Sequence, residues 1–326
     1  GMIDQNSSSI TDICEIGRGI FGVSHAITKS NNRFFVMKKL DNNVQIKENC
    51  KKFIGESNHP AIAKYIKFFK KIKPDDNPLL VTDFYTKGSL FDFISLNKTK
   101  AKDFTFFNIE TEFTLSYFIS KGIEFLHSNK IVHGNLTSKN ILIDKNSHPH
   151  LDGFIYKRVN DNENKKMDFV FNYTAPEILK GMKESQKIEP TEQSDIYSFG
   201  MILYEILTGQ SPFQEFDSYE ILSEKIICGL RPPTDTIFEP FIPLIQSCWD
   251  DNPKNRPTAK EVSSKIHQIA KSLNILRWFY SYGQSLDDNS ITETVFDGFW
   301  KPLAKAGERN ESHVAMYVIS LMCLNG

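Results

Sequence analysis

The stretch that decides the fold of this 326-residue chain is Ile131-Val132-His133-Gly134-Asn135-Leu136-Thr137-Ser138-Lys139-Asn140. Before it, apolar residues recur about every 3.6 positions over residues 113–127, which predicts a buried helix. An asparagine amide has no accessible basic site near neutral pH, so Asn135 can orient a hydroxyl group but cannot take its proton. The stretch therefore places polar side chains directly after a buried helix.

The stretch resembles the catalytic loop of protein kinases, HRDLxxxN. In that family the Asp accepts the proton of the substrate hydroxyl and the distal Asn binds magnesium. Here Asn135 stands at the Asp position and Gly134 at the Arg position, Thr137 replaces the usual loop lysine, and Asn140 is kept. General base catalysis typically contributes roughly 10²- to 10⁴-fold to a rate. The resemblance therefore implies a catalytic loop without its base.

The metal-binding motif of the family is also altered. Where kinases have Asp-Phe-Gly, the chain has Gly153-Phe154-Ile155, and glycine offers no ligand for magnesium. Asp152 lies one residue earlier, and a shift of one residue on an extended segment turns a side chain to the opposite face. Asn140 and Asp152 are the two remaining candidates for a metal, and Mg²⁺ is not expected to bind as it does in active kinases.

A glycine-rich motif and a lysine imply a nucleotide. Gly17-Arg18-Gly19-Ile20-Phe21-Gly22 matches GxGxFG, in which a hairpin lies close over the nucleotide phosphates. Lys38 follows on a predicted strand and fits the lysine that pairs with the α and β phosphates. Its usual partner is a Glu on the next helix, but that position falls on Cys50, whereas Glu48 is two residues away. The partner of Lys38 stays open.

The resemblance implies ATP as the cofactor and further contacts with it. Thr82 resembles the gatekeeper residue, Asp83 and Tyr85 would contact the adenine edge, and Leu142 fits the pocket floor. Val36 occupies the roof, where kinases usually have Ala.

Structural motifs of the family are intact. Thr174-Ala175-Pro176-Glu177 matches the APE motif, and Arg256 matches the buried arginine with which its Glu pairs. Asp195 begins a DxxxFG segment and would brace the catalytic-loop backbone, while His133 and Phe154 would pack in the core that links the lobes. The amino-acid sequence of several motifs is most similar to that of the tyrosine-kinase-like group.

In many kinases a phosphorylated residue switches the activity on, and this chain lacks both parts of that switch. The Arg of HRD often clamps a phosphorylated residue of the activation loop. Gly134 cannot do so, and residues 158–171 contain no Ser, Thr or Tyr.

We therefore predict an α+β, bilobal protein-kinase-like fold. The expected parts are a tail (1–10), a β-rich N-lobe (11–82), a hinge (83–86), a helical C-lobe (87–272) and a helical extension (273–326). The extension resembles one Sel1-like repeat, and a plain helical extension packed on the C-lobe is the alternative.

Three local predictions follow from the pattern. Residues 44–56 carry a helix-compatible stripe, and residues 97–108 form a polar surface loop between helices. His148 and His150 lie in a surface turn and do not form a metal pair, because no third ligand is nearby.

The composition is that of a soluble globular protein. The formal net charge of −1 lacks the excess of positive charge that binding to nucleic acid or an anionic membrane would favour. The five cysteines are widely spaced without a CxxC pair, which is typical of reduced thiols in a cytoplasmic protein. The amino terminus shows no signal segment.

The sequence thus predicts a pseudokinase that serves as a signalling scaffold or nucleotide-sensing module. The alternative is a divergent active Ser/Thr-type kinase that uses Asp152 and Asn140 for metal. Protein partners are expected to bind the C-lobe and the C-terminal helical segment.

Overall fold

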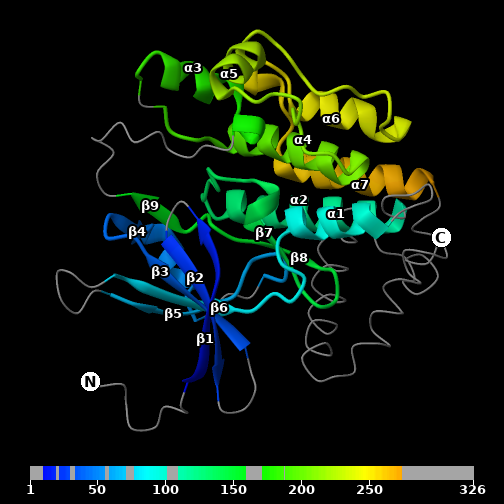
Figure 1. The fold of residues 1–326 in the computed structure, drawn as a ribbon. Helices are drawn as coiled ribbons and strands as arrows, with labels where there is room; N and C mark the ends of the chain where they lie inside the picture. Colours follow the sequence, from blue (N-terminus) through cyan, green and yellow to red (C-terminus); the bar gives the residue numbers. More distant parts are fainter. Residues whose placement is uncertain are drawn as a thin grey trace. The chain divides into compact units, whose positions relative to one another are not determined.

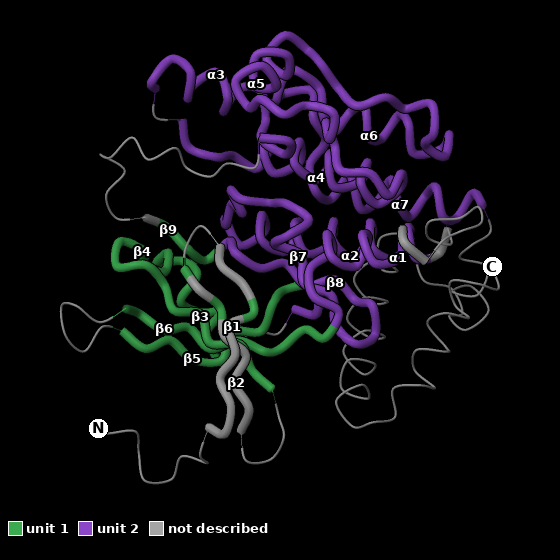
Figure 2. Tube along the Cα trace, in the orientation of Figure 1, with its two compact units in different colours: residues 1–58, 62–86, 155–169 green, residues 59–61, 87–154, 170–326 purple. Residues whose placement is uncertain are grey.

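The computed structural model describes residues 10–19, 22–29, 34–55, 59–70, 77–100, 109–158, 171–186 and 188–273. The chain divides into two compact units, shown in different colours in Figure 2. Unit 1 comprises residues 1–58, 62–86 and 155–169, and unit 2 comprises residues 59–61, 87–154 and 170–326. Unit 1 is rich in strands and unit 2 in helices (Figure 1). The predicted α+β, two-lobed class is confirmed, while the Sel1-like segment lies outside the described residues.

Unit 1 is built on a five-stranded antiparallel sheet. Its strands lie in the order β1 (Ile10–Gly19), β2 (Gly22–Lys29), β3 (Phe34–Leu40), β6 (Leu79–Asp83) and β5 (Tyr65–Phe69). Aromatic and β-branched residues recur in these strands, as expected for a pleated, half-buried surface. Leu40, Tyr65 and Leu80 are at most 1% exposed. They place the apolar core of the unit on the sheet.

The helix predicted over residues 44–56 is wrong in its first half. Residues 44–46 form a strand, β4 (Val44–Ile46), paired antiparallel with β9 (Tyr156–Arg158), and only η1 (Glu48–Phe53), a 3-10 helix, follows. Val44 and Ile46 are buried while the residue between them is exposed, which is the two-residue period of a strand. The pairing partner lies more than a hundred residues away, so a local window could not reveal it.

Unit 2 consists mainly of helices, with one short hairpin. Its helices and strands are α1 (Leu90–Lys100), α2 (Ile109–Ser128), η2 (Ser138–Asn140), β7 (Ile141–Ile143), β8 (Pro149–Leu151), η3 (Phe171–Tyr173), α3 (Pro176–Lys183), α4 (Glu192–Thr208), α5 (Tyr219–Ile227), η4 (Glu239–Phe241), α6 (Ile242–Cys248), η5 (Pro253–Asn255) and α7 (Ala259–Ser272).

Helix α4 is the buried centre of unit 2. Thr191 caps its amino terminus in a reciprocal pair with Ser194, and Gly209 ends it in the left-handed conformation with φ of 66°, both strong boundary signals. Most of its side chains are buried, so the helix is apolar almost all round, as expected of a core helix. The helix predicted over residues 113–127 is confirmed within α2.

Two local predictions for unit 2 need correction. Residues 97–100 belong to the end of α1 rather than to a loop, because the helix begun by the apolar residues near Leu90 continues through polar residues. His148 is only 5% exposed, and His150 lies in β8, so the pair does not form a surface turn. No helix among the described residues is both long and apolar enough to cross a membrane.

Candidate functional site

The start of the 133–140 loop is held by hydrogen bonds from its backbone to one carboxylate, that of Asp195. Asp195, in the first turn of α4 and 1% exposed, accepts hydrogen bonds from the backbone N–H of His133 at 2.8 Å and of Gly134 at 2.9 Å. The Nε2 atom of His127, at the end of α2, lies 2.9 Å from the same carboxylate. Because two helices converge on these atoms, the loop is fixed without help from any reacting side chain.

Gly134 occupies a backbone conformation that suits glycine. Its φ is +74°, and a Cβ atom there would lie 3.3 Å from Cγ of Pro190. L-amino acids other than Asn and Asp rarely adopt such φ values. An arginine at this position would therefore strain the backbone and crowd the proline, so the absent arginine is matched by the local geometry.

The two asparagines of the loop are joined through the backbone. The amide nitrogen of Asn140 donates to the carbonyl oxygen of Asn135 at 2.7 Å, and the backbone N–H of Asn140 donates to the carbonyl of Thr137 at 3.0 Å. Asn135 is half-buried, and its backbone N–H donates to Nδ1 of His133 at 3.3 Å. Asn140 thus ties the loop together with the donor half of its amide.

Gly153 packs directly against that asparagine. Its φ is +84°, and a Cβ atom would lie 3.1 Å from Cγ and 3.2 Å from Oδ1 of Asn140. A larger residue at this position would have to adopt the left-handed conformation and push the amide aside. The space beside Gly153 is therefore occupied by Asn140.

Asp152 lies one residue before Gly153 and is 5% exposed. Its backbone N–H donates to the carbonyl of Asn140 at 2.8 Å, so the two predicted metal candidates are neighbours in the chain fold. Across the described residues, however, no group of three or more His, Cys, Asp or Glu side chains could hold a metal ion. Kinases hold magnesium with an aspartate and the catalytic-loop asparagine, and Gly153 offers no ligand, so a metal role for Asn140 and Asp152 stays a prediction.

His133 and Phe154 form an aromatic contact in the core of unit 2. Their ring centroids are 5.9 Å apart at an angle of 58°, and both residues are at most 1% exposed. This contact packs the loop against the residue that follows Gly153. Its role is apolar and requires no chemistry.

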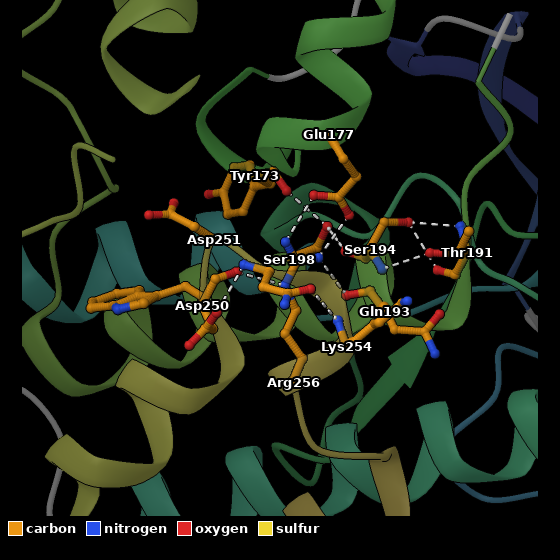
Figure 3. Close-up of polar contacts among 12 residues, drawn as sticks. Tyr173, Glu177, Thr191, Gln193, Ser194, Ser198, Asp250, Asp251, Lys254 and Arg256 are labelled. Atoms are coloured by element: carbon orange, nitrogen blue, oxygen red, sulfur yellow. Dashed lines mark hydrogen bonds and ion pairs between the residues drawn. The ribbon is translucent and has the colours of Figure 1, made fainter. Parts of the chain in front are cut away.

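Arg256 and Glu177 form a two-pronged ion pair in unit 2 (Figure 3). The two nitrogen-oxygen distances are 2.7 and 2.8 Å, and the arginine side chain is 0% exposed. The guanidinium also donates to the carbonyls of Gln193 at 3.0 Å and Asp250 at 2.9 Å, and it lies 5.1 Å from the ring centroid of Tyr197. Nearly every donor of the buried cation therefore has an acceptor, which is what allows its burial.

The glycines of the glycine-rich segment lie on β1 and β2, and Lys38 lies on β3, the strand paired with β2. Gly17 and Gly19 lie near the end of β1, paired with Ser24 and Gly22 of β2. A Cβ atom on Gly22 would come within 2.0 Å of the carbonyl oxygen of Lys39, so only glycine allows the hairpin to approach β3 this closely. Lys38 and Val36 follow each other on one face of β3, as alternate residues of a strand do.

The family model of the protein kinase domain matches residues 10–267 of the chain. The chain belongs to the protein kinase family. Among the relatives is a probable serine/threonine-protein kinase of Dictyostelium discoideum, 40% identical over 162 residues, which cover 48% of this chain and 17% of the relative.

Other kinase relatives match over more of the chain. A tyrosine-protein kinase of Girardia tigrina is 27% identical over 300 residues, 86% of this chain and 57% of the relative. A dual specificity protein kinase of Dictyostelium discoideum is 28% identical over 276 residues, 82% of this chain and 19% of the relative. The chain therefore spans only part of the length of each of these kinases.

The residues predicted to form the hinge are bonded to the segment that precedes β5. Thr82 is 1% exposed, and its hydroxyl donates to the carbonyl of Asp83 at 3.3 Å. The backbone N–H of Asp83 donates to the carbonyl of Lys64 at 3.1 Å, and the hydroxyl of Tyr85 accepts from the N–H of Lys64 at 2.9 Å. The adenine contacts expected of these residues stay predictions.

In unit 2, Leu142 is half-buried on β7 and pairs with Ser89 through an isolated antiparallel β-bridge. Its contact with adenine also stays a prediction.

The position predicted for the kinase helix glutamate falls on a buried thiol. Cys50 in η1 is 0% exposed, and burial raises its pKa to about 11, so the thiol is neutral at physiological pH. Glu48 instead accepts from the ammonium of Lys51 at 2.5 Å and is 83% exposed. The ammonium of Lys38 lies 5.9 Å from the ring centroid of Tyr156.

Sequence reasoning missed two polar clusters in unit 2. The hydroxyl of Tyr173, just before the APE motif, donates to Glu205 at 2.5 Å and lies 2.9 Å from Oγ of Ser138 in the catalytic loop. Burial raises the pKa of Glu205. A buried Glu in the apolar run of α4 was the signal that could have revealed this cluster, because such a carboxylate needs a partner.

The second cluster explains the histidines. Oδ2 of Asp144 lies 3.0 Å from Nε2 of His150 and 3.5 Å from Nδ1 of His148, and Oδ1 accepts from the backbone N–H of His148 at 2.9 Å. These bonds to the two histidines hold the pKa of Asp144 below its usual value despite burial. The cluster closes the β7–β8 hairpin and contains a single carboxylate.

Proposed function

We propose that this protein kinase domain is a pseudokinase, a kinase fold that does not transfer phosphate. The observation that carries the proposal is the joint replacement of base and metal ligand, Asn135 at the base position and Gly153 at the metal position. Phosphoryl transfer depends mainly on metal ions and on positioning of the reactants. Losing both groups together is therefore expected to leave little or no turnover.

The geometry around both positions supports the proposal. The backbone at Gly134 and Gly153 has φ of +74° and +84°, and the side chains of Pro190 and Asn140 fill the space in which a larger side chain would begin. An arginine at position 134 would meet backbone strain, and an aspartate at position 153, which tolerates positive φ better, would crowd the amide of Asn140. Gly134 and Gly153 therefore suit their backbone conformations and the space around them, as expected of a kinase fold that is retained without catalytic activity.

Nucleotide binding without transfer is a second candidate function, and unit 1 favours it. The close approach of Gly22 to β3 and the lysine at position 38 are both retained, and both serve phosphate binding in kinases. These residues fit ATP, since backbone N–H groups and an ammonium are the groups that recognise phosphate. Phosphate oxygens would be held by Lys38 and the hairpin backbone, with no role for a resident metal.

Melting temperatures with ATP, measured with and without Mg²⁺, test these assignments. A ligand that binds only the folded state stabilises it by RT ln(1 + [L]/Kd). We expect ATP to raise the melting temperature by the same amount in both conditions. A shift that requires Mg²⁺ and is lost in Asp152→Ala would instead favour the divergent active kinase. No shift in either condition would leave a scaffold that does not bind nucleotide.

The proposed output is protein binding, in a signalling scaffold. Helix α5 leaves Tyr219 59% and Ile221 53% exposed, and the ring of Tyr219 stacks on Phe171 at 5.3 Å between centroids. Exposed apolar side chains of this size are candidates for a protein-binding surface. The Sel1-like segment in residues 273–326 is proposed to add contacts. Pull-downs that are unchanged by Tyr219→Ser with Ile221→Ser, with wild-type melting retained, would count against the α5 surface.

A further inference from the structure

The charges of the chain are divided unequally between the two units. Unit 1 contains 17 Lys and Arg residues against 12 Asp and Glu, whereas unit 2 contains 22 against 28. The formal net charge of −1 therefore combines a basic unit with an acidic one. A charge asymmetry between two parts of a chain points to an anionic partner for the basic part.

Lysines of unit 1 gather around η1. The ammonium of Lys51 donates to Glu48 at 2.5 Å, and the charges of Lys157 and Lys70 also hold the pKa of Glu48 below its ordinary value. One carboxylate thus lies among three ammonium groups. Two further lysines lie near the thiol of Cys50, where their charges oppose the effect of burial on its pKa. The lysine cluster comprises Lys47, Lys51, Lys52, Lys70 and Lys157.

The fold brings these lysines together from three segments. On β9, Lys157 stands opposite Gln45 of β4, the strand that leads into η1 (Figure 1). After η1, Ile54 forms a parallel bridge with Tyr65, the first residue of β5, and Lys70 follows the last residue of that strand. The cluster is therefore a product of tertiary structure and not of a local run of charge.

The cluster presents its charge to solvent from a fixed base. Cys50 and Phe53, on the inner side of η1, are 0% and 5% exposed. The side chain of Lys51 is 47% exposed, and the other lysines of the cluster are exposed except Lys47, which is half-buried. The ammonium groups can thus reach a partner without any change in the backbone of unit 1.

The size of the cluster favours a short anionic segment over a long polyanion. An exposed ion pair contributes little by itself, whereas several like charges held together steer association with an oppositely charged partner. This attraction reaches about 8 Å at physiological ionic strength. Nucleic acids and anionic membranes extend much further, and against them the basic unit is offset by the acidic unit, wherever the latter lies.

We propose that the lysine cluster around η1 is a docking surface for an acidic peptide segment of a partner protein. Carboxylate groups of the segment would bind the ammonium groups of Lys51, Lys70 and Lys157, and Glu48 would compete with them from within the cluster. The surface lies in unit 1, apart from the α5 surface in unit 2, and it requires neither nucleotide nor phosphate transfer.

Fluorescence anisotropy with the full chain tests the proposal. The probe is a labelled peptide of alternating Glu and Gly, and the same peptide with Gln in place of Glu is its control. We expect the wild type to bind only the acidic peptide, and more weakly as salt is raised. The triple variant Lys51→Gln, Lys70→Gln, Lys157→Gln should bind it about 3- to 150-fold more weakly, the range that three exposed ion pairs supply.

A second triple variant separates the cluster from the net charge of the chain. Lys254, Lys260 and Lys265 are exposed lysines of unit 2, and their joint change to Gln alters the formal charge by the same amount. This variant should bind the acidic peptide as the wild type does. Equal weakening by both triple variants, with wild-type melting retained, would overturn the proposal. Tighter binding of phosphatidylserine vesicles or duplex DNA through the cluster would also overturn it.

Single variants predict an effect of opposite sign. Glu48→Gln removes the competing carboxylate and should strengthen binding of the acidic peptide by about 2- to 5-fold. Asp235→Asn, an equal change of charge on an exposed loop of unit 2, should have no effect. Lys38→Met should also bind the peptide as the wild type does, which distinguishes the cluster from the nucleotide site. Weaker binding in Glu48→Gln, or loss of binding in Lys38→Met, would contradict the assignment.

Discussion

The surroundings of Arg256 and the loop around Asn135 lie in the same unit and differ in what they retain. Arg256 keeps its carboxylate partner, two backbone acceptors and an aromatic neighbour. The loop keeps its backbone support from Asp195, while Asn135 and Gly153 stand at the positions where the family has its base and its metal aspartate. The contacts that hold the kinase fold are therefore retained beside motif positions that differ from the family. The two sets of residues can be changed independently.

The largest expected effect lies in the Arg256 cluster. Glu177→Ala would leave the guanidinium, 0% exposed, buried without its carboxylate, which typically costs about 3–5 kcal/mol. Urea denaturation of the variant should show this loss. Lys183→Ala is the matched control, because its pair with Glu224 is 61% and 62% exposed and is expected to contribute little to stability. Similar small losses in both variants would show that the buried pair is not a structural anchor.

The next effect concerns the support of the loop. Asp195→Asn replaces a carboxylate oxygen with an N–H₂ group and so loses charge-assisted bonds to His133 or Gly134. We expect a loss of about 2–3 kcal/mol of stability. Asp235→Asn, on an exposed loop, should leave the unfolding midpoint unchanged. If Asp195→Asn did the same, the loop would be held by other contacts.

Much of this architecture could be predicted from the sequence. The pairing of Glu177 with Arg256 and the place of Asp195 follow from motif order, and the 3.6-residue apolar period over residues 113–127 marked helix α2. The strand at residues 44–46 could not be predicted, because its partner β9 is remote in sequence. The long-range strand pairing determined the structure of residues 44–46, although the local apolar pattern was also compatible with a helix.

A smaller effect is expected at the metal position. Gly153→Ala places a Cβ atom 3.1 Å from Asn140 at a φ of +84°, whereas Gly55→Ala has a similar φ of +89° with its nearest atom at 3.9 Å. Backbone strain should cost each variant about 1 kcal/mol. Gly153→Ala should lose more, because the asparagine must also move. Equal losses in chemical denaturation would show that Asn140 does not restrict this position.

The smallest effect is a pH dependence. Burial raises the pKa of Glu112 on α2 to about 8. A carboxyl whose folded pKa is raised favours the folded state while protonated, so this stabilisation is lost as pH rises from about 4.5 to about 8. At pH 8.5, Glu112→Gln should therefore have a higher melting temperature than the wild type. The expected gain in the free energy of unfolding is roughly 1 kcal/mol after allowance for solvent exposure. The two proteins should converge at pH 4, and a constant difference at all pH values would exclude this cause.

The candidate site was predictable only where side chains follow a motif. The sequence located Asn135, Gly153 and Lys38, because their spacing defines them. It could not reveal the positive φ at Gly134 and Gly153, which depends on the path of the backbone, nor the ring of Tyr156 near Lys38, which depends on strand pairing. Burial of His148 was missed because a polar residue beside a proline is typical of a turn.

Transfer of labelled γ-phosphate from ATP to a generic protein substrate, in the presence of Mg²⁺, tests the central claim most directly. The wild type and Lys38→Met are compared at equal concentration, with melting curves to show that both are folded. We predict that incorporation by the wild type equals that by Lys38→Met, since base and metal ligand are both absent. Incorporation that the wild type supports and Lys38→Met abolishes would contradict the account.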